Sequence, residues 1–351
     1  MMRHKTSLAA LISVFLASSL AIAQEDLIHP KFEMTKFGQA GMKFLEIGLS
    51  ARAEGMGGAV SSVPMGALSM FYNPAGLASV IGERGDVYAG LTQWMANINV
   101  MGFAAAYKTP WVVVGVSGMS VDYGQIIGTR MIDRLKWEET GDVDVSSSAF
   151  GIGAAKRVTD KFQIGVTARY VTEDLAGTND NTGTYVPVGP SVSTLVFDAG
   201  TLYRTGWGSS VISMSIRNFS TKVKHQDEDY ELPLIFRIGV ATDVLNLSPG
   251  AAGPHGLIVS VDALHPRDRA EEAILGLEYN LMKMVYVRAA SRLGHNYTGS
   301  DPERPVTVNL ASLGAGVRYK LGPTDLSVNY AWANQGSLLG SVNRFDVQVG
   351  F

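Results

Sequence analysis

The side chains that could do chemistry are scattered along this chain rather than gathered into motifs. There is no cysteine among its 351 residues, so thiolate metal sites, cysteine nucleophiles and disulfides are excluded. The histidines beyond residue 23 lack metal-ligand spacing, and no P-loop, H-E-x-x-H or G-x-S-x-G motif occurs. We therefore expect no enzyme, no metal site and no cofactor.

The charge balance excludes one class of partner. The chain carries 29 basic and 32 acidic side chains, a formal net charge of −3. A mildly acidic chain binds polyanions poorly, so nucleic acid is not expected as a partner. Only 17% of the residues are charged, against about 25% in a typical soluble protein. The low fraction suggests that much of the surface does not face water.

The charged residues share a position within a two-residue alternation. In 162–170, large apolar side chains stand mainly at even positions, whereas Gln163, Thr167 and Arg169 stand at odd ones. A strand presents successive side chains to opposite faces, and an arginine facing lipid at mid-membrane would cost about 2–4 kcal/mol. We therefore place the charged set in a lumen. This set comprises Arg169, Asp198, Arg217, Arg237, Asp243, Asp262, Glu278, Arg288, Arg318 and Asp346.

Fourteen such segments occupy residues 85–351, each about nine to fourteen residues long, as a tilted membrane-crossing strand requires. Long connections at 122–145, 175–191 and 219–232 alternate with short ones, a pattern typical of outer-membrane barrels. The sequence predicts an all-β fold, a transmembrane antiparallel β-barrel of about 14 strands. The predicted strands are 85–93, 97–108, 111–121, 146–158, 162–174, 192–204, 209–218, 233–243, 254–262, 271–280, 284–293, 307–320, 324–334 and 343–351.

Residues 1–23 carry a secretory signal in three parts. Arg3 and Lys5 form a basic start, an apolar run follows, and Ala21-Ile22-Ala23 is a small-residue cleavage site. The alternative, an uncleaved membrane anchor, is disfavoured because the apolar run is short. We expect a chain exported to the outer membrane of a Gram-negative type of cell, with membrane lipid as its surroundings.

Residues 24–84 differ in composition from the barrel and are predicted to form a plug inside it. This segment is rich in small residues, which let backbone pack closely against backbone, and Asn73-Pro74 sets a turn or a helix start. A periplasmic tail is the alternative, but such a tail would not carry Phe44, Leu45 and Met70. The candidate plug and hatch residues are Gly55, Gly57, Gly58, Asn73, Pro74, Ala75 and Gly76.

Several blocks of the chain resemble the PorV/PorQ family, which is grouped with the FadL-like outer-membrane barrels. The blocks include Phe44-Leu45-Glu46-Ile47-Gly48, Ala51-Arg52-Ala53-Glu54-Gly55-Met56-Gly57-Gly58-Ala59, Tyr72-Asn73-Pro74-Ala75-Gly76-Leu77-Ala78, Ser215-Ile216-Arg217-Asn218-Phe219 and Val261-Asp262-Ala263-Leu264-His265-Pro266. The resemblance implies fourteen strands and an N-terminal hatch. One departure is that an acidic pair common in the family is replaced here by Ser61-Ser62-Val63-Pro64-Met65-Gly66.

Two functional interpretations follow from the resemblance, and a structural outer-membrane protein with neither role is the third, weaker alternative. As a PorV-like protein, the chain would bind C-terminal sorting domains of type IX secretion cargo through its outer loops, with Trp137 and Tyr230 as exposed contacts. It would then pass that cargo to a surface-attachment complex. As a FadL-type channel, it would instead take up hydrophobic small molecules such as fatty acids. In either case Phe351, in phase with the lipid face, resembles the terminal aromatic that serves as a barrel-assembly signal.

Overall fold

The computed structural model describes residues 40–133, 136–143, 145–174, 178–179, 185–186, 191–225, 228–247, 253–296, 306–335 and 340–351. Barrel and plug belong to one unit, formed by residues 37–296 and 307–351. The predicted signal segment, 1–23, lies outside the described residues and stays a prediction. No helix in the described part of the chain is long and apolar enough to cross a membrane.

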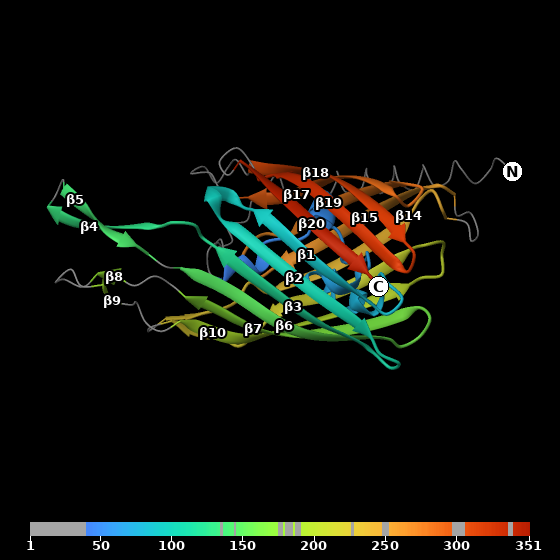
Figure 1. Ribbon diagram of the computed structural model, residues 1–351, viewed down its shortest axis with the longest axis horizontal. Coiled ribbons are helices and arrows are strands. Elements are labelled where there is room, and N and C mark those ends of the chain that lie inside the picture. Colours follow the sequence, from blue (N-terminus) through green and yellow to red (C-terminus); the bar gives the residue numbers. More distant parts are fainter. Residues whose placement is uncertain are drawn as a thin grey trace, which may run out of the picture. The chain divides into compact units, whose positions relative to one another are not determined.

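Fourteen antiparallel strands form a closed barrel, as predicted (Figure 1). Each strand pairs with its neighbours in sequence once three small hairpins are set aside, and the first strand pairs with the last to close the ring. The barrel strands are β1 (Gly85–Gln93), β2 (Asn99–Lys108), β3 (Val113–Asp122), β6 (Ser146–Arg157), β7 (Phe162–Asp174), β10 (Val192–Arg204), β11 (Val211–Phe219), β14 (Ile235–Asp243), β15 (His255–Pro266), β16 (Glu272–Leu281), β17 (Val285–Asn296), β18 (Val306–Leu321), β19 (Thr324–Asn334) and β20 (Ser341–Gly350).

Every predicted strand overlaps an observed one, but the long connections contain hairpins that the alternation does not predict. Each of three connections carries a hairpin that pairs only with itself. Their strands are short or polar and lack a sustained apolar face, so alternation did not reveal them. The hairpin strands are β4 (Ile127–Asp133) with β5 (Lys136–Asp142), β8 (Thr178–Asn179) with β9 (Tyr185–Val186), and β12 (Val223–His225) with β13 (Glu228–Tyr230).

The two faces of the barrel wall differ as the alternation predicted. Val116, Ile152 and Val166 point outward and are 48%, 67% and 58% exposed, whereas Thr167 and Arg169 point inward and are buried. A continuous exposed apolar face is unfavourable in water but suits hydrocarbon. The charged set is therefore on the luminal side, as the cost of an ion in lipid predicts.

Among the barrel ladders whose pairing is described, one contains an irregularity. The register between β10 and β11 shifts at Phe197/Ala199, and Asn218 on β11 has a φ of 61°. The shift corresponds to a β-bulge, which inserts one extra residue and re-aims the side chains beside it. The backbone N–H of Asn218 donates to Asp198 at 2.8 Å, and Arg169 donates to the Asn218 side-chain oxygen at 2.7 Å. The bulge is thus held by buried polar partners.

Short helices make up the segment before the barrel, which folds within the ring of strands (Figure 1). They are the 3-10 helix η1 (Lys43–Glu46), the α-helix α2 (Ala51–Gly55), and the 3-10 helices η2 (Gly66–Phe71) and η3 (Pro74–Ala78), while η4 (Met95–Asn97) joins β1 to β2. Ser50 caps α2 by accepting from the N–H of Ala53, and Asn73 caps η3 by accepting from the N–H of Ala75. Residues 49–77 are buried apart from Arg52 and Pro64, as a plug requires.

Phe351 lies at the seam where β20 meets β1, and its assembly role stays a prediction. Its N–H donates to the carbonyl of Gly85 at 2.9 Å, and its carbonyl accepts from the N–H of Arg84 at 2.8 Å. The side chain is 42% exposed on the outer side of the wall.

We expect Phe351→Asp to reduce the amount of inserted barrel severalfold, because it removes an apolar side chain whose burial in lipid stabilises the seam by about 1.5–3 kcal/mol. Phe351→Leu is the matched control and should insert normally. Heat-modifiable mobility of the membrane fraction on a gel measures both. Normal levels of the folded band for Phe351→Asp would contradict the assignment.

Candidate functional site: the plug and its seat in the lumen

A carboxylate of the barrel wall binds the start of the plug helix α2. Asp346 on β20 accepts the backbone N–H of Ala51 at 2.7 Å, the N–H of Arg52 at 3.3 Å and the hydroxyl of Ser50 at 2.9 Å. The first N–H groups of a helix have no partner within the helix, and an anion is favoured there. Asp346 is 3% exposed, so this carboxylate and the helix start satisfy each other away from water.

Two further wall carboxylates bind the plug in the same manner. Asp262 on β15 accepts from the N–H and the hydroxyl of Ser61, at 3.1 and 2.8 Å. Asp86 on β1 accepts from the N–H of Ala67 in η2 at 2.9 Å. An acidic side chain in place of Ser61 would face the carboxylate of Asp262, so a serine at this position suits the wall.

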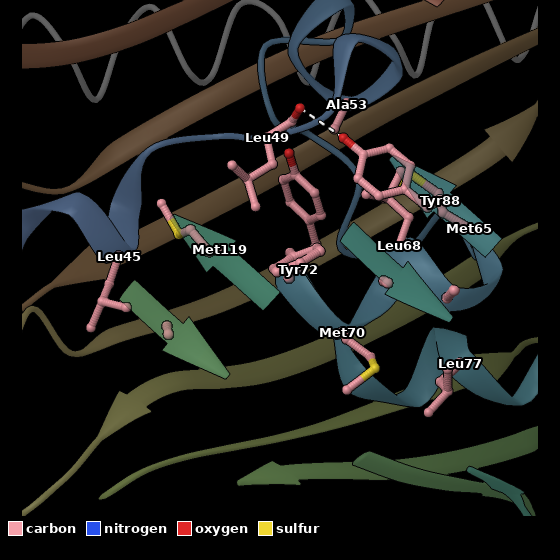
Figure 2. Packing of buried hydrophobic residues seen from close by; sticks show 14 of the residues in the cluster. Leu45, Leu49, Ala53, Met65, Leu68, Met70, Tyr72, Leu77, Tyr88 and Met119 are labelled. Atoms are coloured by element: carbon pink, nitrogen blue, oxygen red, sulfur yellow. Dashed lines mark hydrogen bonds between the residues drawn. The ribbon is translucent and has the colours of Figure 1, made fainter. Parts of the chain in front are cut away.

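Basic and phenolic side chains of the wall bind the plug carbonyls. Tyr88 donates to the carbonyl of Leu49 at 2.8 Å, as Figure 2 shows. Three wall arginines also donate to carbonyls of the plug. These hydrogen bonds offset part of the free-energy cost of removing the guanidinium groups from water. These contacts run from Arg237 to Gly58 at 2.6 Å, from Arg292 to Gly57 at 2.9 Å and from Arg344 to Gly48 at 2.9 Å.

One plug arginine enters a buried ion-pair network of the wall. Arg52 donates twice to Glu278 on β16, at 2.8 and 2.9 Å, and Arg288 on β17 donates to the same carboxylate at 2.6 Å. Burial by itself lowers the pKa of Arg52, but the charge of Glu278, the hydrogen bonds that Arg52 donates to it and a smaller contribution from Tyr286 together outweigh burial, and the net pKa is raised. Arg52 therefore stays charged. Without its side chain, the buried carboxylate of Glu278 would keep Arg288 but lose the two hydrogen bonds from Arg52.

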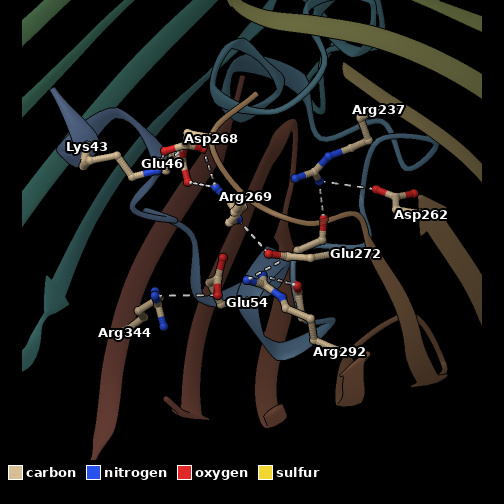
Figure 3. A network of polar contacts seen from close by, with 12 residues as sticks. Lys43, Glu46, Glu54, Arg237, Asp262, Asp268, Arg269, Glu272, Arg292 and Arg344 are labelled. Carbon is tan, nitrogen blue, oxygen red and sulfur yellow. Dashed lines mark hydrogen bonds and ion pairs between the residues drawn. The ribbon is translucent and has the colours of Figure 1, made fainter. Parts of the chain in front are cut away.

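Residues 40–48, which we call the cover segment, lie at the end of the barrel with the long connections. Lys43 pairs with Asp268 at 2.7 Å, and Glu46 pairs with Arg269 at 2.5 Å, both in the β15–β16 connection (Figure 3). The N–H of Gly41 donates to the carbonyl of Glu231 at 3.0 Å. These pairings join residues more than 180 positions apart, and no local pattern could have predicted them.

The interior of the barrel is mostly apolar on one side and mostly charged on the other. Figure 2 shows the apolar side, where plug residues such as Leu49, Met70 and Leu77 pack within one cluster with wall residues. Its inward wall residues include Tyr88, Val100, Ala104, Ala106, Met119, Val121, Ala149, Ala155, Val171 and Val196. Figure 3 shows part of the charged side, carried by β14 to β20. Its buried wall residues include Arg237, Asp262, Glu278, Arg288, Arg344 and Asp346.

The predicted hatch residues Asn73 and Pro74 fit against wall glycines. A side chain at Gly165 on β7 would overlap the backbone of Pro74, and one at Gly200 on β10 would overlap the amide of Asn73. Asn73 also donates to the carbonyls of Ser61 and, at 3.2 Å, of Thr201 on the wall. These strand glycines were missed as site residues. The sequence does contain a signal for them. Each is a glycine at a strand position that faces the lumen, and such a glycine indicates that another backbone approaches closely.

The other predicted plug residues are also buried in the lumen, for two different reasons. Gly57 and Gly58 have φ values of 65° and 85°, where glycine is favoured. Gly55 does not have a positive φ. It packs closely on the wall instead, since a Cβ at this position would lie 3.1 Å from the Cα atom of Gly314. Ala75 and Gly76 belong to η3 and are buried.

The two predicted cargo contacts differ in exposure. Trp137 on β5 is 65% exposed, as expected. Tyr230 on β13 is partly buried against the apolar cluster, and a side chain at Gly41 would overlap its ring. The expected exposure of Tyr230 is therefore wrong, because the ring packs on the cover segment instead of facing outward. Neither placement tests a role in cargo binding.

An open apolar depression of about 750 Å³ lies on the wall around β2, β3, β6 and β7. It is lined partly by Ala105, Ala154 and Ala168. Glycines 115 and 153 form its thin floor, and side chains added there would meet Met70 of the plug. The described ladders of these four strands show no register shift, so the floor is closed by backbone pairing.

Solved structures with a similar fold include two proteins described as toluene transporters and one described as a FadL homologue. The toluene transporter TodX of Pseudomonas putida matches with a TM-score of 0.57 at 13% identity, over 90% of this chain and 98% of that one. The toluene transporter TbuX of Ralstonia pickettii matches with a TM-score of 0.54 at 13% identity, over 86% and 97%. A FadL homologue of Pseudomonas aeruginosa matches with a TM-score of 0.52 at 12% identity, over 86% and 97%.

These likenesses show the fold alone. Together with the closed ring of fourteen antiparallel strands, they confirm the predicted fold class. No family model matches the sequence, and no curated protein matches it. Membership of the PorV/PorQ family therefore stays a prediction from the sequence blocks.

We expect Asp346→Ala to loosen the plug without opening the barrel. It leaves buried N–H groups of α2 without an acceptor, at about 1–3 kcal/mol each. Amide hydrogen exchange at Ala51 and Arg52 should then accelerate by roughly tenfold or more, while heat-modifiable mobility stays normal.

The matched control is Asp325→Ala, because the Asp325 carboxylate is equally buried but binds Arg318 of the wall at 2.6 Å. This variant should leave exchange in the plug unchanged. Equal acceleration in both variants, or none in Asp346→Ala, would contradict the assigned role of Asp346.

Proposed function

We propose that this protein is an outer-membrane conduit for hydrophobic small molecules, with the plug as its gate. The observation that carries the proposal is the division of the lumen. On the apolar side, plug side chains such as Met70 and Leu77 lie in one cluster with small wall residues, including Ala106 and Ala155, and a Cβ at Gly115 of the wall would meet both of these plug side chains. An apolar molecule that displaced those plug side chains would meet mainly small and apolar wall side chains, so little polar surface would have to be desolvated.

The character of the wall supports the membrane location and an orientation. The outward face is apolar, and Trp111 and Trp207 are 78% and 67% exposed in two connections at the short-turn end, where amphipathic rings favour a membrane interface. Short turns face the periplasm in outer-membrane barrels. The cover segment then lies at the outer mouth, and Phe351 lies at the periplasmic end.

The solved structures of similar fold support the kind of ligand. Two are described as toluene transporters, and a third, CymD, as a monoaromatic hydrocarbon channel with a TM-score of 0.51 at 12% identity, over 89% of this chain and 97% of that one. Identities this low carry the fold alone, so the ligand class for this chain rests on its own lumen.

We expect expression of the protein in a Gram-negative host without such a transporter to raise uptake of labelled toluene severalfold and to leave uptake of a labelled sugar unchanged. Met119→Gln should reduce toluene uptake, because an unpaired amide on the apolar side costs about 1–3 kcal/mol. Met131→Gln is the control, since Met131 is 76% exposed on β4.

Uptake is compared between strains that contain equal amounts of folded, heat-modifiable protein. A rise in sugar uptake together with toluene would indicate an unplugged pore. No rise in toluene uptake would contradict the conduit.

A second function, binding of type IX secretion cargo and its transfer to an attachment complex, is favoured by one observation. Met131, Ile132 and Trp137 are 76%, 60% and 65% exposed on the hairpin β4–β5. Exposed apolar side chains clustered on one hairpin are typical of a surface that binds a protein.

If this second role holds, the purified barrel captures a secreted protein that carries a C-terminal sorting domain. We then expect Trp137→Ala to weaken capture by about tenfold, or 1.4 kcal/mol. Trp111→Ala, which removes a comparably exposed ring at the short-turn end, should not. Failure of the wild-type barrel to capture the protein would contradict the role.

A further inference from the structure

The open apolar depression on the outer wall results from small side chains placed between large ones. It crosses β2, β3, β6 and β7, which lie side by side in Figure 1. Ala105 and Ala168 share one outward row of the sheet, and Ala154 stands in the next row. Phe197 lines one edge of the depression and Phe351 the other. A hollow that faces hydrocarbon is filled by whatever lies there, because its lining atoms otherwise lose dispersion contacts.

The depression lies within one half of the membrane thickness. Along β6 it includes Ile152 and Ala154, and the next outward residues on either side are Phe150 and Lys156. Phe150 borders it together with Phe103 of β2, whose ring centroid is 6.5 Å away. From Phe150 to Lys156 the strand runs about 20 Å. At a tilt of about 45° this is about 14 Å of depth, close to half of a hydrocarbon core of about 30 Å.

The end of the depression nearest the short turns is basic. Lys156 points to the outer side of β6, and Lys108 directly follows Tyr107, which lines the depression on β2. Both lysines are exposed, and in the described part of the chain neither pairs with a carboxylate. The exposed acids in the short connections on this side of the barrel are Glu83 and Asp160. The basic residues there are Arg84, Lys108, Lys156, Arg157, Lys161 and Arg204.

We propose that the depression binds an anionic phospholipid, with one acyl chain on the alanines and the phosphate at Lys156 and Lys108. The apolar lining suits the chain. Lysines at the level of the membrane surface attract anionic lipid, and these two have no carboxylate to compete for them. The orientation proposed above puts this half of the wall in the periplasmic leaflet, which consists of phospholipid. The inference goes beyond the conduit and rests on the proposed function only for that orientation.

Native mass spectrometry of the purified protein, mixed with equal amounts of phosphatidylglycerol and phosphatidylcholine of the same acyl chains, measures the binding. We expect the wild type to retain phosphatidylglycerol in preference by about fivefold or more. The double variant Lys108→Gln with Lys156→Gln should bring the ratio close to one. Ala154→Phe fills the depression and should lower the retention of both lipids severalfold.

Matched controls are available on the other side of the barrel. Lys283 in the β16–β17 turn and Lys320 near the end of β18 are also exposed lysines at the short-turn end, and neither lines the depression. Lys283→Gln with Lys320→Gln should keep the preference for phosphatidylglycerol. Ala315 is an exposed alanine on the outward face of β18, and Ala315→Phe should leave lipid retention unchanged. All variants are compared as folded, heat-modifiable protein.

Absence of a preference in the wild type, or its persistence without Lys108 and Lys156, would overturn the lipid site. So would an equal loss in the control double variant, since the attraction would then belong to the whole basic end. A dimer that Ala154→Phe abolishes while lipid retention is unchanged would assign the depression to a second copy of the chain instead. If Ala154→Phe does not fold, the lysine variants carry the test.

The outcome is independent of the conduit. Loss of toluene uptake with a preserved preference for phosphatidylglycerol would remove the conduit and leave the lipid site. Loss of the preference with normal toluene uptake would do the reverse.

Discussion

A peptide segment enclosed by a barrel cannot rely on water for its backbone hydrogen bonds, and this requirement shapes the structure. The helix start at Ala51, the turn at Ser61 and the start of η2 each receive a wall carboxylate, from Asp346, Asp262 and Asp86. Plug carbonyls in turn receive wall arginines. The charges of the wall would be costly to bury alone. Plug and wall therefore satisfy each other, and neither is complete without the other.

The same contacts suggest where the plug can move. The cover segment is held partly by ion pairs at the barrel mouth, one of them through a half-exposed Lys43, and such contacts open at low cost. The deeper plug is held by buried carboxylates on one side and by packing of Met70 and Leu77 on the other. In the proposed gating, movement that begins at the cover segment and reaches Met70 displaces η2 from Asp86 and the turn at Ser61 from Asp262, whereas the contacts of Asp346 with α2 stay in place. A hydrophobic ligand would then displace the cover segment first and the apolar side of the plug next.

Strand positions and wall faces could be predicted from sequence because they depend on local alternation. Arg169 and Asp198 could be placed inside the barrel because a charged side chain that faces lipid carries a high free-energy cost. The contacts of the plug could not be predicted, since they depend on which strand of a closed ring faces each turn. Lys43 and Asp268 are separated by 225 positions. The bulge at Asn218 and the burial of Tyr230 also depend on tertiary contacts that no local pattern encodes. Inward glycines such as Gly200, by contrast, are visible in the sequence and indicate that another backbone approaches closely.

The central claim is that the plug gates the conduit and must move for a ligand to pass. Because the chain has no cysteine, one engineered disulfide can test it. The hydroxyl oxygens of Ser62 in the plug and Ser213 on β11 are 2.9 Å apart. The double variant Ser62→Cys with Ser213→Cys should lose toluene uptake when oxidised and recover it on reduction, whereas each single variant should behave like wild type. Undiminished uptake through the oxidised double variant, with the disulfide verified by mass spectrometry, would contradict a gating plug.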